Sequence, residues 1–227
     1  MWLTILGVAL AALAGLALYF VATARRIARP TRGEPIAGEA TKGALLVIDM
    51  QEDFTRSHGA NAYDGEERDR AIARINALVA AARQAGEPVA FIRQEHQGRA
   101  VQWVASLLLG GAGNPGRPGA RLDRDVDADG CPVFVKHVAD AFSDPALDAW
   151  LREQEVGRLT LTGLDLAHCV RGTALGARNR GYRVTVDLAG SLAAREKPAL
   201  HAVDEMETAG VVLRGPEDGA ARAAAMI

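Results

Sequence analysis

Three residues that can perform acid–base or nucleophilic chemistry follow apolar runs typical of buried strands. Asp49 ends the run ALLVID, Lys136 follows Val-Phe-Val, and Cys169 comes shortly after a run that ends at Gly163. In an open parallel sheet, ligands bind outside the carboxyl ends of the strands, so these side chains are expected at one edge. There Cys169 would be the nucleophile and Asp49 the base that accepts its proton. Lys136 and the N-terminus of a helix beginning near Cys169 are both expected to lower the thiol pKa.

Each of these residues alone also has a structural interpretation. A strand-terminal Asp often forms a turn, a Lys after apolar residues usually reaches solvent, and an isolated Cys is usually a small buried side chain. Their shared placement at strand ends favours chemistry. The second cysteine, Cys131, precedes Pro132 at the opposite end of a strand and is interpreted as structural.

The elements that must position these residues alternate between strand and helix. The apolar runs lie at 44–50, 89–93, 132–137, 159–163, 182–188 and 211–213. Helical patterns lie at 66–86, at about 169–180 and around 195–208, and a further helix is expected to begin at Pro145 with Asp144 as its cap. Between the second and third runs, a short helix is possible at 101–109, and a loop is expected at 110–119. This alternation predicts a three-layer α/β/α, Rossmann-like domain with a six-stranded parallel sheet.

The first 24 residues differ from the rest because residues 2–24 contain no charged residue and no His. A bilayer-spanning helix needs about 20 apolar residues, and four arginines follow at 25, 26, 29 and 32. We therefore expect one membrane-spanning helix, with the catalytic domain in the cytoplasm. A cleaved signal peptide and a buried helix are the alternatives. The expected organisation is an anchor at 1–24, a flexible linker at 25–42, a folded domain at 43–214 and a tail at 215–227.

Composition limits the function classes further. The 227 residues are 49% hydrophobic, which excludes a disordered chain. Lys and Arg number 26 against 28 Asp and Glu, so there is no basic field to bind nucleic acid. The 2 cysteines have no metal-binding spacing and favour a reducing compartment.

Three motifs resemble the isochorismatase-like cysteine hydrolases, a family that includes nicotinamidases, N-carbamoylsarcosine amidases and isochorismatase. They are LLVIDMQEDF at 45–54, Val135-Lys136 with Ala141-Phe142, and Thr162-Gly163 through Cys169-Val170 with Thr173. The resemblance covers about residues 43–213. It implies a catalytic triad of Asp49, Lys136 and Cys169 and the strand order 3-2-1-4-5-6. It also implies a non-proline cis peptide at Leu164-Asp165, which would aim the Asp165 and Cys169 N–H groups at an oxyanion.

Departures from the family pattern bear on metal and substrate. Nicotinamidases of this family usually hold a metal with an Asp-x-His pair and a second His, whereas this chain has Gln94-Glu95-His96 and no further His before His137. We therefore expect no metal and no cofactor. Asp140 stands where the family usually has Ser. Phe54, Phe142 and His168 are further candidates for lining the substrate pocket. Core packing would explain the two phenylalanines equally well, and a surface position at a helix cap would explain His168 equally well.

Together these features predict a membrane-anchored hydrolase that cleaves a small-molecule amide through a Cys169 thioester. The alternatives are hydrolysis of an isochorismate-like vinyl ether, and an idle binding or redox-sensing module. The expected partners are the amide substrate, the membrane and, as in relatives that self-associate, further copies of the chain.

Overall fold

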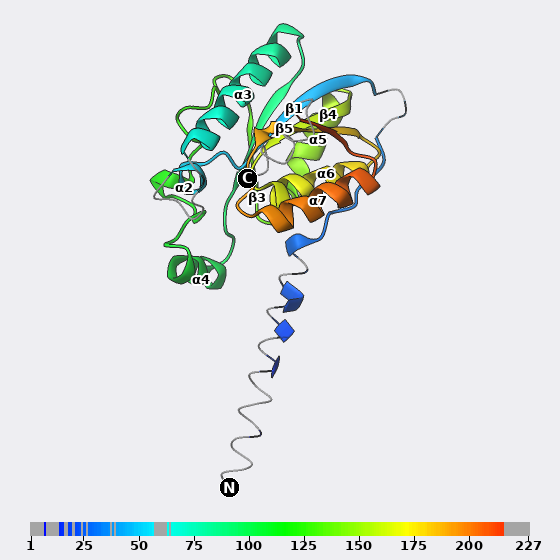
Figure 1. Cartoon of the computed structure of the whole chain (residues 1–227). Helices are drawn as coiled ribbons and strands as arrows, with labels where there is room; N and C mark the ends of the chain where they lie inside the picture. The colour runs from blue at the N-terminus through cyan, green and yellow to red at the C-terminus, as the bar shows by residue number, and fades with distance from the viewer. Residues whose placement is uncertain are drawn as a thin grey trace.

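The sheet has six parallel strands in the order β3-β2-β1-β4-β5-β6 (Figure 1). The computed structural model describes residues 7, 14–15, 18–19, 21–23, 25, 27–36, 38, 40–56, 63 and 65–215. The strands are β1 Lys42–Ile48, β2 Val89–Gln94, β3 Val133–Lys136, β4 Val156–Gly163, β5 Arg183–Ser191 and β6 Val212–Arg214. The predicted α/β fold and strand order are thereby confirmed.

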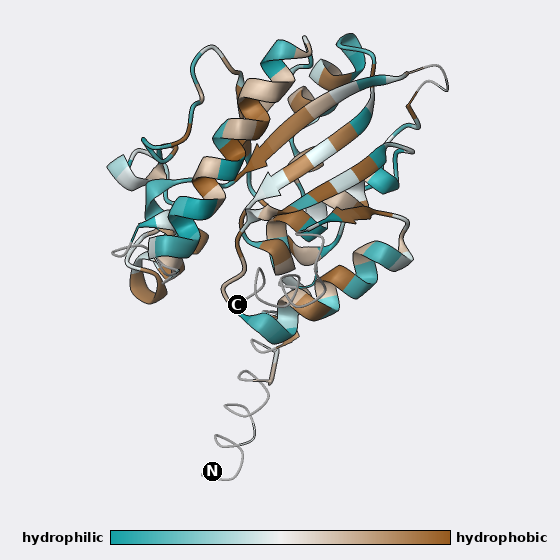
Figure 2. Ribbon diagram, turned by 45° about the horizontal axis from the view of Figure 1, so that its top comes forward, coloured by the Kyte–Doolittle hydropathy of each residue, from teal (hydrophilic) through white to brown (hydrophobic). Residues whose placement is uncertain are grey.

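Apolar side chains alternate between the two faces of the sheet and build one core on each. On β1, Leu46 and Ile48 belong to one core, while Leu45 and Val47 belong to the other. The first core is closed by α5 (Pro145–Glu153), α6 (Arg171–Arg178) and α7 (Glu196–Thr208), and the second by α3 (Gly65–Gln84). Figure 2 shows strands on which brown apolar segments alternate with paler and teal ones, with helices of mixed brown and teal on both sides. Both faces are covered, which leaves the carboxyl edge of the strands for a site.

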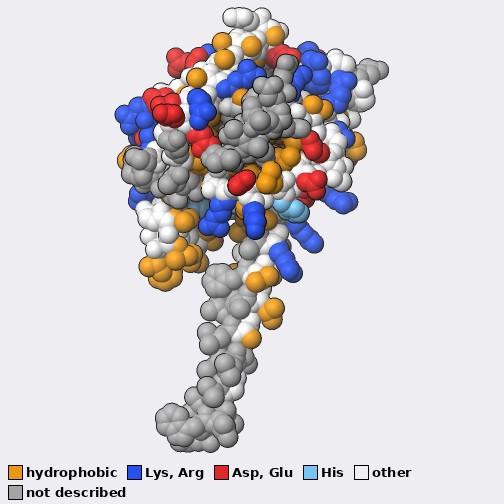
Figure 3. All heavy atoms as spheres, viewed as in Figure 1, with side chains coloured by type: hydrophobic (Ala, Val, Ile, Leu, Met, Phe, Trp, Pro, Cys, Tyr) orange, Lys and Arg blue, Asp and Glu red, His pale blue; other side chains and the backbone are white. Residues whose placement is uncertain are grey.

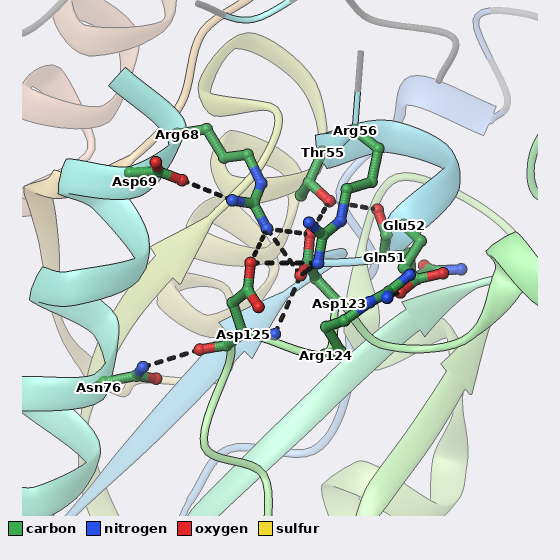
Figure 4. Close-up of polar contacts among 10 residues, drawn as sticks. All are labelled: Gln51, Glu52, Thr55, Arg56, Arg68, Asp69, Asn76, Asp123, Arg124 and Asp125. Atoms are coloured by element: carbon green, nitrogen blue, oxygen red, sulfur yellow. Dashed lines mark hydrogen bonds and ion pairs between the residues drawn. The ribbon is translucent and has the colours of Figure 1, made fainter. Parts of the chain in front are cut away.

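The region between β2 and β3 contains α4 (Arg99–Leu108), close to the short helix that the sequence predicts, and a 3-10 turn at Pro118–Ala120. The loop that follows is fixed by the buried carboxylate of Asp123 (Figure 4). Asp123 accepts hydrogen bonds from Arg68 on α3 at 2.7 Å, from Arg56 at 2.6 Å, and from Thr55 in α2 (Glu52–Thr55). This cluster ties α2, α3 and the loop together beside the end of β1.

Residues 27–36, within the expected linker, are held against the domain. The backbone N–H and the hydroxyl of Thr31 donate to Asp140 Oδ2 at 2.7 and 2.6 Å. Arg180 donates to the Thr31 hydroxyl at 2.9 Å, and the Ile36 N–H donates to the Arg180 carbonyl at 2.9 Å. Because Asp140 is 0% exposed, Thr31 supplies hydrogen bonds that this buried carboxylate cannot obtain from water.

The prediction of a membrane-spanning helix over residues 1–24 is wrong. In the part of the chain that the structure describes, no helix is both long and apolar enough to cross a bilayer. The 20 residues of α3 have the length, but its first four residues, Gly65–Arg68, include Glu66, Glu67 and Arg68. The predicted membrane partner and the predicted single-pass location with a cytoplasmic domain depended on this helix and are wrong as well. Many residues of the 1–24 segment, and the expected tail from 216 onward, lie outside the described residues.

Candidate active site

Asp49 follows β1 at the carboxyl edge of the sheet. Its φ of 54° is one that residues other than glycine seldom adopt, and it turns the chain sharply from β1 toward α2. The side chain is buried. Its Oδ2 atom lies 2.7 Å from the Lys136 ammonium. Oδ1 is also buried and has no partner of ordinary hydrogen-bond geometry among the described residues, although the Cys169 thiol is near enough to influence its pKa.

Lys136 ends β3 and lies at the centre of the site, with its side chain 0% exposed. Its ammonium meets three acceptors, namely Asp49 Oδ2 at 2.7 Å, Cys169 Sγ at 3.1 Å and Gln94 Oε1 at 2.7 Å. An ammonium has three protons to donate, so this buried charge is fully hydrogen-bonded. The three residues predicted from strand ends are therefore brought together, and Gln94 is an addition that sequence reasoning missed.

Cys169 lies in a π-helix, Leu166–Val170, that follows β4 and continues into α6. Burial raises the pKa of its thiol to about 12; Lys136 opposes this and the negative charge of Asp49 adds to it. The expected lowering of the thiol pKa is therefore wrong, because sequence alone does not show how far the sulfur is desolvated. Cys169 holds its proton at neutral pH.

The pKa values of Asp49 and Lys136 are shifted as well. Burial raises the pKa of Asp49 above its usual value, against the attraction of Lys136. Burial alone would lower the pKa of Lys136, but Asp49 and Cys169 together raise it above its usual value. Burial therefore raises the pKa of both Asp49 and Cys169, and the Lys136 ammonium, whose own pKa is raised, lies between them.

The turn before Cys169 has the backbone geometry that the resemblance implies, since the Leu164–Asp165 peptide is cis. The Asp165 side chain accepts hydrogen bonds from Ala167 N–H and Ala194 N–H, each at 2.7 Å. It also accepts one from the Tyr63 hydroxyl at 3.3 Å. These contacts fix the turn against two distant segments.

Tyr63 is a second residue at the site that the sequence did not reveal. Burial, followed by the charges of Asp165 and Cys169, raises the pKa of its hydroxyl, so the phenol stays protonated and able to donate. It lies between α2 and α3, in a segment with no periodic pattern, so no sequence signal marked it.

The three candidate pocket residues lie in different surroundings. Phe54 is half-buried and borders Gly113 together with His96. Phe142 is buried in the core, 5.6 Å from the Tyr182 ring, and His168 is exposed.

The end of β2 is where the resemblance would place a metal site of the nicotinamidase type, and the residues here do not fit one. Gln94 Oε1 is committed to the Lys136 ammonium, and the Glu95 carboxylate pairs with Arg93 at 2.8 Å. Within the described ranges, no three His, Cys, Asp or Glu side chains are grouped so that they could hold an ion.

Comparisons with known proteins agree with this architecture. The chain is 39% identical over 70 residues to the nicotinamidase of Escherichia coli strain K12, a match that covers 30% of this chain and only 33% of that protein. It is 29% identical over 182 residues to the ureidoacrylate amidohydrolase of Variovorax paradoxus, covering 67% of this chain and 69% of the relative.

Among solved structures, pyrazinamidase of Pyrococcus horikoshii in complex with zinc has the same fold. Its TM-score is 0.64 at 24% sequence identity, over 76% of this chain and 98% of that one. The model of the isochorismatase domain matches residues 43–217, which include every residue of the site and all of the sheet except Lys42 at the start of β1. The chain therefore belongs to the isochorismatase family of hydrolases.

Proposed function

We propose that the protein is an amidohydrolase that cleaves the C–N bond of a small-molecule amide through a thioester on Cys169. One observation carries the proposal, namely the buried Lys136 ammonium that bridges the Asp49 carboxylate and the Cys169 sulfur at 2.7 and 3.1 Å. A nucleophile, a base and a fixed positive charge within hydrogen-bond reach form the arrangement that covalent catalysis requires. Two relatives named for amide hydrolysis support the substrate class.

In the first half of the reaction, Asp49 takes the thiol proton as the sulfur attacks the substrate carbonyl carbon. Lys136 stays charged and stabilises the negative charge as it moves from Asp49 to sulfur. The carbonyl oxygen becomes an oxyanion, for which the backbone N–H groups of Asp165 and Cys169 are the proposed donors. As the C–N bond breaks, Asp49 gives its proton to the nitrogen, and the amine leaves a Cys169 thioester.

In the second half, water enters the position of the departed amine. Asp49 takes a proton from this water, whose oxygen attacks the thioester carbonyl. The C–S bond then breaks and the acid product leaves. The sulfur recovers the proton from Asp49, so the site returns to a thiol, a carboxylate and an ammonium.

The test is hydrolysis of a panel of primary amides, ureides and lactams, measured as ammonia release for the first two classes and by mass spectrometry of the ring-opened amino acid for the lactams. We expect turnover of at least one class by the wild-type chain and by Cys131→Ala, the matched control for the other cysteine. Cys169→Ala and Asp49→Asn are expected to abolish turnover, because each removes a participant in the covalent step. Turnover that survives in Cys169→Ala would refute the thioester, and its absence across the whole panel would favour the idle-module alternative.

A further inference from the structure

The end of β2 carries a hydrogen bond that the triad chemistry does not explain. Gln94 points its side-chain oxygen at the Lys136 ammonium, 2.7 Å away, as near as Asp49 is on the other side. In the sequence, Gln94 stands where nicotinamidases of this family usually have the acid of a metal-binding pair. Its contact with Lys136 shows that the position is engaged by the catalytic lysine.

The Gln94 backbone is fixed independently of its side chain. The Gln51 side-chain amide donates to the Gln94 carbonyl at 3.1 Å and accepts from the Gln94 N–H at 2.6 Å. The same Gln51 amide donates to the Ala120 carbonyl at 2.9 Å, and Gln51 is 0% exposed. A change confined to the Gln94 side chain therefore leaves these anchors in place.

We infer that Gln94 is a positioning residue that takes the third proton of Lys136 and thereby holds its ammonium, charged, against the sulfur. The inference deepens the proposed function, because it assigns to the same site a role for a residue outside the triad. A buried ammonium with an unsatisfied N–H is costly, so without Gln94 it moves toward water or loses its proton more readily. Either change weakens its stabilisation of the Cys169 thiolate.

The neutral charge of Gln94 matters as much as its oxygen. A carboxylate here would keep an acceptor for Lys136 but place a second negative charge beside Asp49 and the developing thiolate. A like charge a few ångströms away raises the pKa of a thiol by about one to three units. An amide accepts the proton and leaves the charge of Lys136 available to the sulfur.

The experiment measures alkylation of Cys169 by iodoacetamide in the full chain, followed by peptide mass spectrometry across pH, with Cys131 as the internal reference. Gln94→Met is close in size and lacks the acceptor, and we expect it to slow Cys169 alkylation about tenfold at pH 8, the least that one hydrogen bond to a charged group implies. In a Lys136→Met background, the same change should have no effect, because Gln94 acts through that lysine. An equal slowing in both backgrounds, or none in either, would overturn the inference.

Gln94→Glu retains the acceptor and serves if Gln94→Met fails to fold. Its alkylation profile should move to higher pH by about one to three units, and an unmoved profile would overturn the inference. Gln102→Met removes a glutamine hydrogen bond to the His96 carbonyl nearby and should leave the profile unchanged.

Two further outcomes separate this inference from the proposed function. If Lys136→Met slows alkylation but Gln94→Met does not, Gln94 loses its role and the triad stands. If the coupling is found but no amide is hydrolysed, the role of Gln94 stands and the proposed function fails.

Discussion

Replacing Thr31 with Val tests whether the segment before β1 is part of the folded domain. The Asp140 carboxylate is 0% exposed, and its Oδ2 accepts from both the N–H and the hydroxyl of Thr31. Valine keeps the volume and the backbone N–H but removes the hydroxyl. The change therefore breaks two hydrogen bonds, one donated to the buried Asp140 carboxylate and one accepted from Arg180. A hydrogen bond to a charged group contributes about 1.5–3 kcal/mol, so Thr31→Val should lower the free energy of unfolding by at least about 1.5 kcal/mol.

The assay is urea unfolding of the full chain followed by circular dichroism, with Thr41→Val as the control. Thr41 is an exposed threonine in the same segment, so its change should stay within about 0.5 kcal/mol. A second background, Asp140→Ser, removes the charge while keeping an oxygen able to cap the turn at Phe142. There the Thr31→Val penalty should shrink, because the charged acceptor is gone.

Two results would refute this reasoning. One is a Thr31→Val protein as stable as Thr41→Val, which would mean that the segment does not satisfy the buried carboxylate. The other is the same penalty in the Asp140→Ser background, which would assign the effect to something other than this contact.

Two other perturbations have equally definite outcomes. Asp123→Asn removes the anion that Arg68 and Thr55 contact and should cost about 3–5 kcal/mol in urea unfolding, whereas exposed Asp129→Asn should cost little. Those contacts lower the pKa of Asp123 although burial alone would raise it. The stabilisation by Asp123 is therefore complete above its usual pKa of 3.8 and is lost as the pH falls through its lower pKa in the folded protein. At that acidic pH, the free energies of unfolding of the Asp123→Asn and Asp129→Asn proteins should converge. In amide hydrolysis, the rate should rise with pH as Asp49 ionises. Because burial raises the pKa of Asp49, the midpoint of this rise should lie above pH 3.8. A midpoint that is unchanged in a Lys136→Met protein with residual activity would contradict the coupling of the two charges.

The sheet and the edge that carries the candidate site could be predicted because both follow from short-range patterns. Apolar runs alternating with helical periodicity specify a parallel sheet, and every residue that ends such a run arrives at the same edge. Lys136 leaves a strand that is not adjacent to β1 and still reaches Asp49, because its long side chain crosses the end of β2. That path brings it past Gln94.

The remaining site features depend on contacts between segments without periodicity. Tyr63 and Thr31 lie in such segments, and each acts through a hydrogen bond to a residue about 100 positions away. The thiol pKa was mispredicted for a related reason, because residue types show which charges are near Cys169 but not how completely burial removes water.

The central claim is that Cys169 forms a covalent acyl intermediate. The most direct measurement is acid quenching of the full chain during turnover of an amide from the panel, followed by mass spectrometry of the intact chain and of its peptides. We predict a mass increase equal to the acyl group of that substrate, located on the peptide containing Cys169 and absent in Cys169→Ala. Steady turnover without an acylated Cys169, and undiminished in Cys169→Ala, would contradict the account.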